Sequence, residues 1–384
     1  MLGHAFIVGG TGQIGRAVAS NLLEHGWDVT LLHRGRQIVP AGLIERGAKV
    51  ATLDRNEPCA LAAVIRKGAD AVIDTVAFTA EHGRQLVALD DTVGTFVVVS
   101  SASVYRDAAG RTLDEARKNG FPDLPVPIPE THPTVSPGPE TYSTRKIALE
   151  NEILDHARCS VTVLRPCAIS GRGSQSPREW WFVKRILDGR RLIPLAYQGV
   201  SRFHTSSVDN IAELVRFAAE KPGRRVLNAA DPVAPTVNEI GAVIAQCLGQ
   251  DCEFVEIPDT GFPPAVGATP WSVPRPFVLD TCAAVDLGYM PVTTYAESVA
   301  SICTWLGETS TKGDWRNLFP GLARYPRELF DYAAEDSFLR SIRIGIGGSL
   351  STPPLPHHRT YGSVYGGSRS CANALRSRRG DRAI

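Results

Sequence analysis

A glycine-rich turn near the N-terminus constrains the fold more than any other feature of this chain. It reads Gly9-Gly10-Thr11-Gly12-Gln13-Ile14-Gly15, follows an apolar run at residues 5–8, and precedes a helical pattern at residues 15–25. A strand, a glycine turn and a helix in this order are typical of folds that bind a dinucleotide, whose pyrophosphate needs bare N–H groups at a helix N-terminus. The alternative is a glycine-rich turn that holds no ligand.

Each glycine of the turn is expected to have its own role. Gly9 permits a tight turn, Gly12 lets the pyrophosphate approach the backbone, and Gly15 lets the helix pack closely on the strand. Cofactor contacts are predicted for six residues of the turn, namely Gly9, Thr11, Gly12, Gln13, Ile14 and Gly15.

Short apolar runs alternate with helical patterns over the first 165 residues, as in repeated βαβ units. Strands are predicted at residues 5–8, 29–32, 49–53, 71–75, 95–100 and 161–164. Because these runs are nearly all apolar, they suit parallel strands covered on both faces. The predicted fold is α/β, with a Rossmann-like doubly wound parallel sheet at residues 1–165 that binds NAD(P). A smaller α/β substrate-binding region, interleaved with the first, is predicted at residues 166–330.

The rest of the chain divides into segments of different character. Helices are predicted at residues 177–187, 207–220, 236–248 and 296–306, and a short strand at 225–228. Residues 108–139, rich in Pro and Gly, are predicted to form a loop region. Residues 341–384 contain seven Arg and one Asp, and are predicted to be a disordered basic tail. The alternative for this tail is an arm that binds nucleic acid or a partner protein.

A serine-rich strand end and a Tyr-x-x-x-Lys pair are the candidate catalytic groups. Residues four apart share one face of a helix, so Lys146 is expected to lie beside the Tyr142 ring. A phenol titrates near pH 10, and a nearby ammonium lowers that value, so Tyr142 can exchange a proton with a substrate hydroxyl or carbonyl. Ser101 is expected to hydrogen bond to the same substrate oxygen, a role that Ser103 could also take.

The segment after the second predicted strand bears on the choice between NAD and NADP. An acidic residue there would read the ribose 2′-hydroxyl of NAD, but this chain has Leu32-His33-Arg34-Gly35-Arg36. Arg34 or Arg36 could pair with the 2′-phosphate of NADP, which favours NADP over NAD. A solvated surface arginine is the alternative.

Four segments resemble successive landmarks of the NAD-dependent epimerase/dehydratase family, within the extended and atypical short-chain dehydrogenases. They are SSASVY at 100–105, TYSTRK at 141–146, TVLRP at 162–166 and RFHTSSVDNIA at 202–212, and the resemblance covers roughly residues 4–306. It implies that Asp54 lies near the adenine, that Val76, Ala77 and Pro166 line the nicotinamide side, and that Lys146 holds the nicotinamide ribose. It also implies that Ser103 contacts substrate and that Arg202 contacts the diphosphate of a nucleotide sugar, unless Arg202 pairs with a neighbouring carboxylate.

The chain departs from the family in three places. Asp74-Thr75-Val76-Ala77 replaces the usual His and Ala-Ala after the fourth strand. Ala102-Ser103 stands where sugar-nucleotide dehydratases have an Asp-Glu pair, which makes dehydration less expected than epimerisation or reduction. The loop at residues 175–191 matches no sugar-specific motif of the family. Its Trp180 and Trp181 could stack on a base or sugar ring, although core packing is the preferred interpretation.

The favoured function is therefore an NAD(P)-dependent oxidoreductase or epimerase acting on a secondary alcohol or ketone of a sugar nucleotide or related small molecule. The alternative is a non-catalytic NAD(P)-sensing or RNA-associated protein on the same fold.

A net charge of +1 gives the whole chain no bias towards polyanions, so nucleic acid is an unlikely partner. Eight scattered cysteines without metal-ligand spacing, and no long apolar stretch, indicate a cytoplasmic protein with no metal site or membrane contact. The family resemblance also suggests a homodimer.

Overall fold

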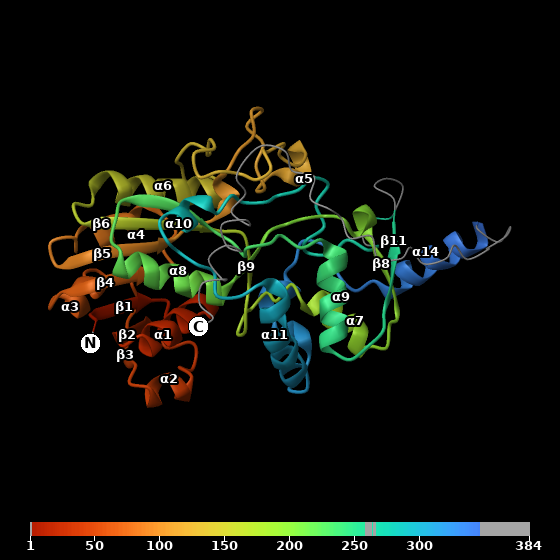
Figure 1. Ribbon diagram of the computed structural model, residues 1–384, viewed down its shortest axis with the longest axis horizontal. Coiled ribbons are helices and arrows are strands. Elements are labelled where there is room, and N and C mark those ends of the chain that lie inside the picture. Colours follow the sequence, from red (N-terminus) through yellow and green to blue (C-terminus); the bar gives the residue numbers. More distant parts are fainter. Residues whose placement is uncertain (1, 258–262, 264–265, 346–384) are drawn as a thin grey trace, which may run out of the picture.

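A parallel sheet of seven strands forms the larger part of the molecule (Figure 1). The computed structural model describes residues 2–257, 263 and 266–345. The strand order is β10-β6-β5-β4-β1-β2-β3, with every neighbouring pair parallel. The strands are β1 (His4–Val8), β2 (Asp28–His33), β3 (Lys49–Thr52), β4 (Ala69–Asp74), β5 (Val93–Val99), β6 (Ser160–Pro166) and β10 (Arg225–Ala229). This confirms the predicted Rossmann-like sheet.

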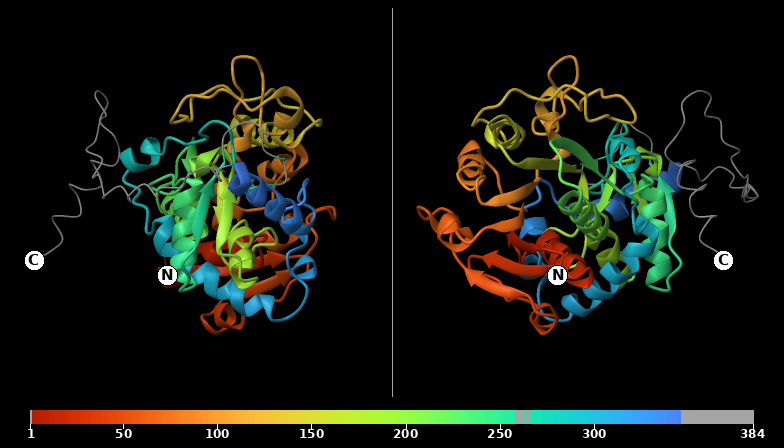
Figure 2. Two further views of the ribbon diagram at one scale, coloured as in Figure 1. Left: turned by 90° about the vertical axis from the view of Figure 1, so that its right-hand side faces the viewer. Right: turned by 60° about the vertical axis from the view of Figure 1, so that its left-hand side comes forward.

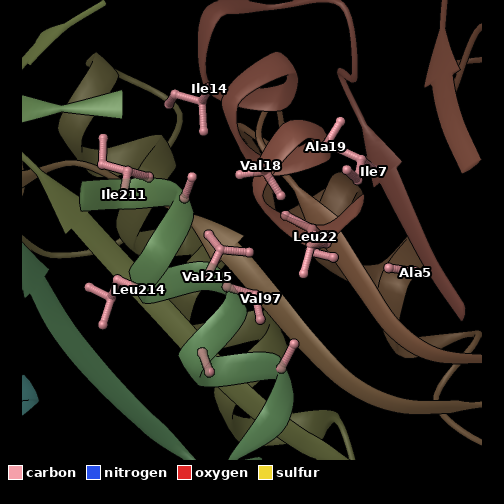
Figure 3. Close-up of a cluster of buried hydrophobic side chains, with 14 of the residues drawn as sticks. Ala5, Ile7, Ile14, Val18, Ala19, Leu22, Val97, Ile211, Leu214 and Val215 are labelled. Atoms are coloured by element: carbon pink, nitrogen blue, oxygen red, sulfur yellow. The ribbon is translucent and has the colours of Figure 1, made fainter. Parts of the chain in front are cut away.

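Side chains of the central strands alternate between two apolar layers. Ala5 and Ile7 of β1 point to the layer that contains α1 (Gln13–Glu24) and α8 (Val208–Glu220). Phe6 and Val8 point to the opposite layer, which contains α3 (Ala60–Ile65), α4 (Ala80–Val87) and α6 (Tyr142–His156). Figure 3 shows the first layer, where side chains of α1 and α8 meet over β1 and β5. Helices therefore cover both faces, which explains why the strands are apolar throughout.

A second region, shown on the right of Figure 1, has its own core. It contains α7 (Trp180–Leu187), α9 (Val237–Cys247), α11 (Tyr295–Ser310), and a parallel pair formed by β8 (Leu192–Leu195) and β11 (Glu253–Glu256). Trp180 and Trp181 are 4% and 1% exposed within this core. Core packing is therefore confirmed for both tryptophans.

The chain passes through part of the second region and then returns to the large sheet. A two-strand bridge of β7 (Ala168–Ser170) and β9 (Thr205–Ser207) leads into α8, which packs on α1, and then into β10 beside β6. Figure 2 shows this return from two further sides. Ser207 caps α8 and Thr236 caps α9, because each side chain accepts a hydrogen bond from a backbone N–H of the first turn.

Several shorter elements lie outside the sequence predictions. These are α2 (Ala41–Glu45), η1 (Ala102–Val104), α5 (Ala116–Asn119), η2 (Ala196–Gly199), α10 (Cys282–Asp286), α12 (Trp315–Leu318) and α13 (Pro320–Ala323). The segment 108–139 is otherwise irregular, as predicted. None of the helices in the described ranges is long and apolar enough to cross a membrane.

One prediction for the C-terminus is wrong. Residues 341–345, assigned to the basic tail, form the end of α14 (Tyr332–Gly345). Arg185 of α7 anchors this helix, because it donates hydrogen bonds to the Glu335 carboxylate and to the Leu329 carbonyl, and both charged side chains are fully buried. The rest of the predicted tail lies outside the described residues.

Candidate active site

The glycine turn has the geometry that a pyrophosphate requires. Gly9 has a φ of +84°, and a Cβ there would lie 2.5 Å from Thr75 Oγ1. A Cβ on Gly15 would lie 2.3 Å from the Gly9 carbonyl oxygen, so only glycine lets α1 pack this closely. Gly12, by contrast, is the N-cap of α1 without a capping side chain, and a Cβ there would approach only the Gly9 oxygen, at 3.4 Å. The space over Gly12 and the first N–H groups of α1 suits an anionic ligand.

A cavity of about 490 Å³ opens beside this turn. Its walls come from the ends of β1, β2 and β3 and from α4, and its volume suits the adenosine half of a dinucleotide. The lining residues include Gly9, Thr11, Gly12, Arg34, Arg36, Asp54, Arg55, Val76 and His82. The residues present therefore fit an NAD(P) molecule. Of the predicted turn residues, Gly9, Thr11 and Gly12 line this cavity, whereas Gln13 lines a neighbouring one.

Charged groups at the mouth of the cavity have different surroundings. Arg34 and Arg36 follow β2 and are exposed. Asp54 follows β3, and its Oδ1 accepts a hydrogen bond from the backbone N–H of Asn56 at 3.0 Å. Arg34 and Arg36 thus bring positive charge to the wall where a ribose phosphate would lie, whereas Asp54 also caps a turn.

Tyr142 and Lys146 stand on the first turn of α6, which a capping box holds in place. The Thr141 hydroxyl accepts a hydrogen bond from the Thr144 N–H, and the Thr144 hydroxyl accepts one from the Thr141 N–H. The Lys146 ammonium lies 5.9 Å from the centre of the Tyr142 ring, on the same side of the helix. Tyr142 is 46% exposed, whereas Lys146 is 5% exposed.

Three serines connect the end of β5 to this helix. The Ser101 hydroxyl donates to Ser103 Oγ at 3.0 Å, and Ser103 Oγ in turn accepts from the Ser143 hydroxyl at 2.9 Å. Ser101 also lies close enough to the Tyr142 phenol to lower its pKa. The structure thus brings Ser101 and Ser103 to the start of the helix that carries Tyr142.

The Lys146 ammonium is held by backbone carbonyls. It donates hydrogen bonds to the Ala77 carbonyl at 2.7 Å and to the Val99 carbonyl at 2.9 Å, which leaves its third N–H for a ligand. Burial lowers the pKa of Lys146 to about 8, although the carboxylates of Asp74 and Glu150 oppose this effect.

Other groups raise and lower the pKa of Tyr142 in the ligand-free protein. Desolvation raises the pKa of Tyr142, the hydrogen bond with Ser101 lowers it, and the Asp114 carboxylate raises it further. The Lys146 ammonium is directed towards the two carbonyls and lies 5.9 Å from the centre of the phenol ring. Tyr142 therefore holds its proton at neutral pH, as a proton donor must.

The remaining cofactor-side predictions lie at neighbouring strand ends. Val76 and Ala77 follow β4, and Pro166 ends β6, paired in register with Ala229 of β10. Val76 is 47% exposed at the cavity, whereas Ala77 is fully buried and contributes its carbonyl to Lys146.

Comparison with known proteins agrees with this geometry. The model of the NAD dependent epimerase/dehydratase family matches residues 5–230. The chain belongs to this family. Among curated protein sequences, none matches it significantly.

Solved structures of epimerases and dehydratases share the fold. The UDP-glucose 4-epimerase of Thermotoga maritima is 18% identical, with a TM-score of 0.60, and the match covers 80% of this chain and 99% of the epimerase. The dTDP-glucose 4,6-dehydratase of Bacillus anthracis, solved with NAD, is 16% identical, with a TM-score of 0.61 and coverages of 81% and 98%. The UDP-N-acetylglucosamine 4-epimerase of Methanobrevibacter ruminantium is 16% identical, with a TM-score of 0.60 and coverages of 80% and 98%.

Arg202, the residue that the resemblance assigns to a substrate diphosphate, lies in the second region of this epimerase/dehydratase fold. Its guanidinium donates a hydrogen bond to the Ala234 carbonyl and lies 3.9 Å from the Glu239 carboxylate, with 40% of the side chain exposed. The alternative prediction, that Arg202 pairs with a neighbouring carboxylate, therefore has a partner in Glu239. At this distance and exposure, the ion pair leaves the guanidinium available to a ligand.

Sequence reasoning missed several polar residues of the site. Arg55 and His82 line the cofactor cavity, and Asp114 lies close enough to Tyr142 to act on its pKa. Asp114 also accepts a hydrogen bond from the Ser143 N–H at 2.8 Å. Arg55 could have been predicted, because it directly follows Asp54 after the end of a strand. Asp114 could not, because it lies in an irregular loop whose sequence does not indicate its position.

Proposed function

We propose that this protein is an NAD(P)-dependent oxidoreductase or epimerase that acts on a secondary alcohol or ketone of a nucleotide sugar or related small molecule. The observation that carries the proposal is that Lys146, on the same helix as Tyr142, bonds to the carbonyl of Ala77, the residue after Val76, which lines the 490 Å³ cavity of the glycine turn, while Ser101 follows the neighbouring strand β5. The epimerases and the dehydratase with the same fold support the substrate class.

In the proposed reaction, Tyr142 moves a proton and Ser101 orients the substrate oxygen. Tyr142 is protonated at neutral pH, so it can donate to a carbonyl oxygen during reduction and recover the proton during oxidation. The Ser101 hydroxyl, next to the phenol, can hydrogen bond to the same oxygen and stabilise charge that develops there. A bound nicotinamide supplies the hydride acceptor or donor, while Lys146 offers its free N–H to the nicotinamide ribose.

We further propose NADP as the preferred cofactor and exclude dehydration from the proposal. Arg34 and Arg36 line the cavity where an NAD-specific site would carry a carboxylate. Ala102 is 1% exposed and Ser103 is hydrogen bonded to Ser143, so neither residue provides the acid and base that elimination of water needs.

The experiment is to determine which cofactor the purified protein carries and binds. Released nucleotide is identified by mass spectrometry, and NADH and NADPH are then titrated by fluorescence against the wild type and Tyr142→Phe. Retained NAD with no net turnover supports epimerisation, whereas empty protein that prefers NADPH supports a reductase. Binding of neither nucleotide would refute the enzyme proposal.

A further inference from the structure

An ion pair with no assigned role is buried beside the cofactor cavity. Arg55 Nη1 lies 2.5 Å from Asp74 Oδ2, and the two side chains are 7% and 0% exposed. Removing two charges from water costs about as much free energy as their attraction returns, so a buried pair is weak support for stability alone. The groups that the two side chains hold indicate a second role.

The other oxygen of Asp74 fixes the turn after β4. Asp74 Oδ1 accepts hydrogen bonds from the N–H groups of Val76 at 3.0 Å and Ala77 at 2.7 Å. The Ala77 carbonyl then accepts the hydrogen bond from the Lys146 ammonium. Two consecutive hydrogen bonds thus lead from the Asp74 carboxylate to the catalytic lysine.

Arg55 holds the carboxylate from the opposite side. Its Nε donates to Gln85 Oε1 at 3.1 Å, and its Nη2 donates to the His82 carbonyl at 3.4 Å, so α4 fixes the guanidinium. Arg55, His82 and Val76 all line the cofactor cavity. The network therefore touches the cavity at one end and Lys146 at the other.

Neighbouring charges both raise and lower the pKa of Lys146. Asp74 and Glu150 favour its charged form, with Asp74 the larger influence, whereas Arg55 opposes it less strongly. Glu150 is itself paired with Arg165, at 2.6 Å. His82 of α4 stays neutral at pH 7, because burial and the charges of Arg55 and Lys146 lower its pKa, and its Nδ1 accepts from the Phe78 N–H. Tyr142, on the same helix as Lys146, is protonated.

We propose that Asp74, held by Arg55, is a positioning residue for Lys146. It fixes the Ala77 carbonyl that orients the ammonium, and its negative charge keeps that ammonium charged beside the cofactor. The inference rests on the proposed function only in giving Lys146 a role towards the nucleotide. The positioning itself can be measured on the ligand-free protein.

The test is an NMR titration of the ¹³Cε resonance of Lys146, assigned with Lys146→Arg. The wild type should titrate near pH 8. In Asp74→Asn, the amide oxygen can still accept from Val76 and Ala77, but the charge is gone, so the midpoint should fall by about one pH unit. Because this variant leaves Arg55 unpaired, the double variant Arg55→Met with Asp74→Asn is measured too. Its midpoint should also fall, since Asp74 outweighs Arg55.

A matched pair elsewhere provides the control. Arg185→Met with Glu335→Gln removes a buried ion pair in the second region, and it should leave the Lys146 midpoint at the wild-type value. Hydrogen exchange reports on the turn: the amides of Val76 and Ala77 should stay protected in Asp74→Asn and exchange faster in Asp74→Ala.

The outcomes separate the two proposals. The positioning role would be overturned if the Lys146 titration midpoint stayed at the wild-type value both in Asp74→Asn and in the double variant with Arg55→Met. It would also be overturned if the midpoint fell by the same amount in Arg185→Met with Glu335→Gln. Failure of the wild type to bind NADH or NADPH would instead overturn the proposed function, whatever the titration shows.

Discussion

Ser143 directly follows Tyr142 in the chain, and its hydroxyl lies 2.9 Å from both the carbonyl oxygen and the hydroxyl oxygen of Ser103. This contact joins the first turn of α6 to the loop after β5, so it sets the distance between the Tyr142 phenol and Ser103. Ser143 is fully buried, and water cannot replace the contact without rearrangement.

Replacing Ser143 by Ala should therefore cost about 1 kcal/mol in the free energy of unfolding, and it should lower turnover more than cofactor affinity. Urea denaturation and NADPH titration measure the two effects. Ser301→Ala is the control, because it removes only a bond to Ser298 in its own helix. Equal stability of the two variants would contradict the structural role of the contact.

Two glycine substitutions in the turn should separate folding from binding. Gly15→Ala places a Cβ 2.3 Å from the Gly9 oxygen and should destabilise the protein, whereas Gly12→Ala meets only one atom at 3.4 Å and should fold normally. Gly12→Ala should nevertheless lose NAD(P) binding, because the Cβ occupies the space over the helix N-terminus. Thermal melts with and without nucleotide measure both effects. Gly42→Ala, in open space on α2, is the control.

Binding of NADPH should weaken as the pH rises through about 8. Burial lowers the pKa of Lys146 to about 8, so the ammonium is charged below that value and attracts the anionic nucleotide. Above it the proton is lost, and the dissociation constant should rise. Fluorescence titrations between pH 6.5 and about 9.5 measure this trend. Lys146→Met should bind NADPH weakly at every pH. If its dissociation constant still rose above about pH 8, the pH dependence would belong to another group.

Cofactor choice should depend on the arginines after β2. Arg34→Ala should weaken NADPH binding about 10- to 100-fold, the loss expected for a charge-assisted contact, and should leave NADH affinity nearly unchanged. Arg36→Ala, two residues further on, tests which arginine faces the phosphate. Equal losses for NADH and NADPH would place the arginine at the pyrophosphate and not at the 2′-phosphate.

Much of the fold was predictable because the central strands of the large sheet are apolar on both faces and are bounded by turn residues. The helices predicted at residues 207–220 and 236–248 correspond to α8 and α9, whose N-caps are Ser207 and Thr236. The short helices α2 and α5 were missed, since four or five residues give no detectable period. The end of α14 was also missed, because contacts with α7 through Arg185 and Glu335 fix that helix.

The site was predictable where chemistry follows local spacing. The glycine turn and Tyr142 with Lys146 are local patterns, and the structure places each as the spacing implies. The pKa of Tyr142 was not predictable, because it depends on Asp114, from a distant loop, and on which way the Lys146 ammonium turns. The Arg55–Asp74 pair joins residues 19 apart across two strands, and nothing in the local sequence couples them.

The return of α8 and β10 to the large sheet makes the nucleotide-binding half dependent on chain that is synthesised later. A fragment ending at residue 165 would leave β6 paired only with β5, as an exposed edge strand, and it would expose the face of α1 on which α8 packs. During translation this half therefore cannot complete its core until residue 229 has emerged. Its stability is a property of the whole chain, and the truncated fragment should aggregate instead of folding.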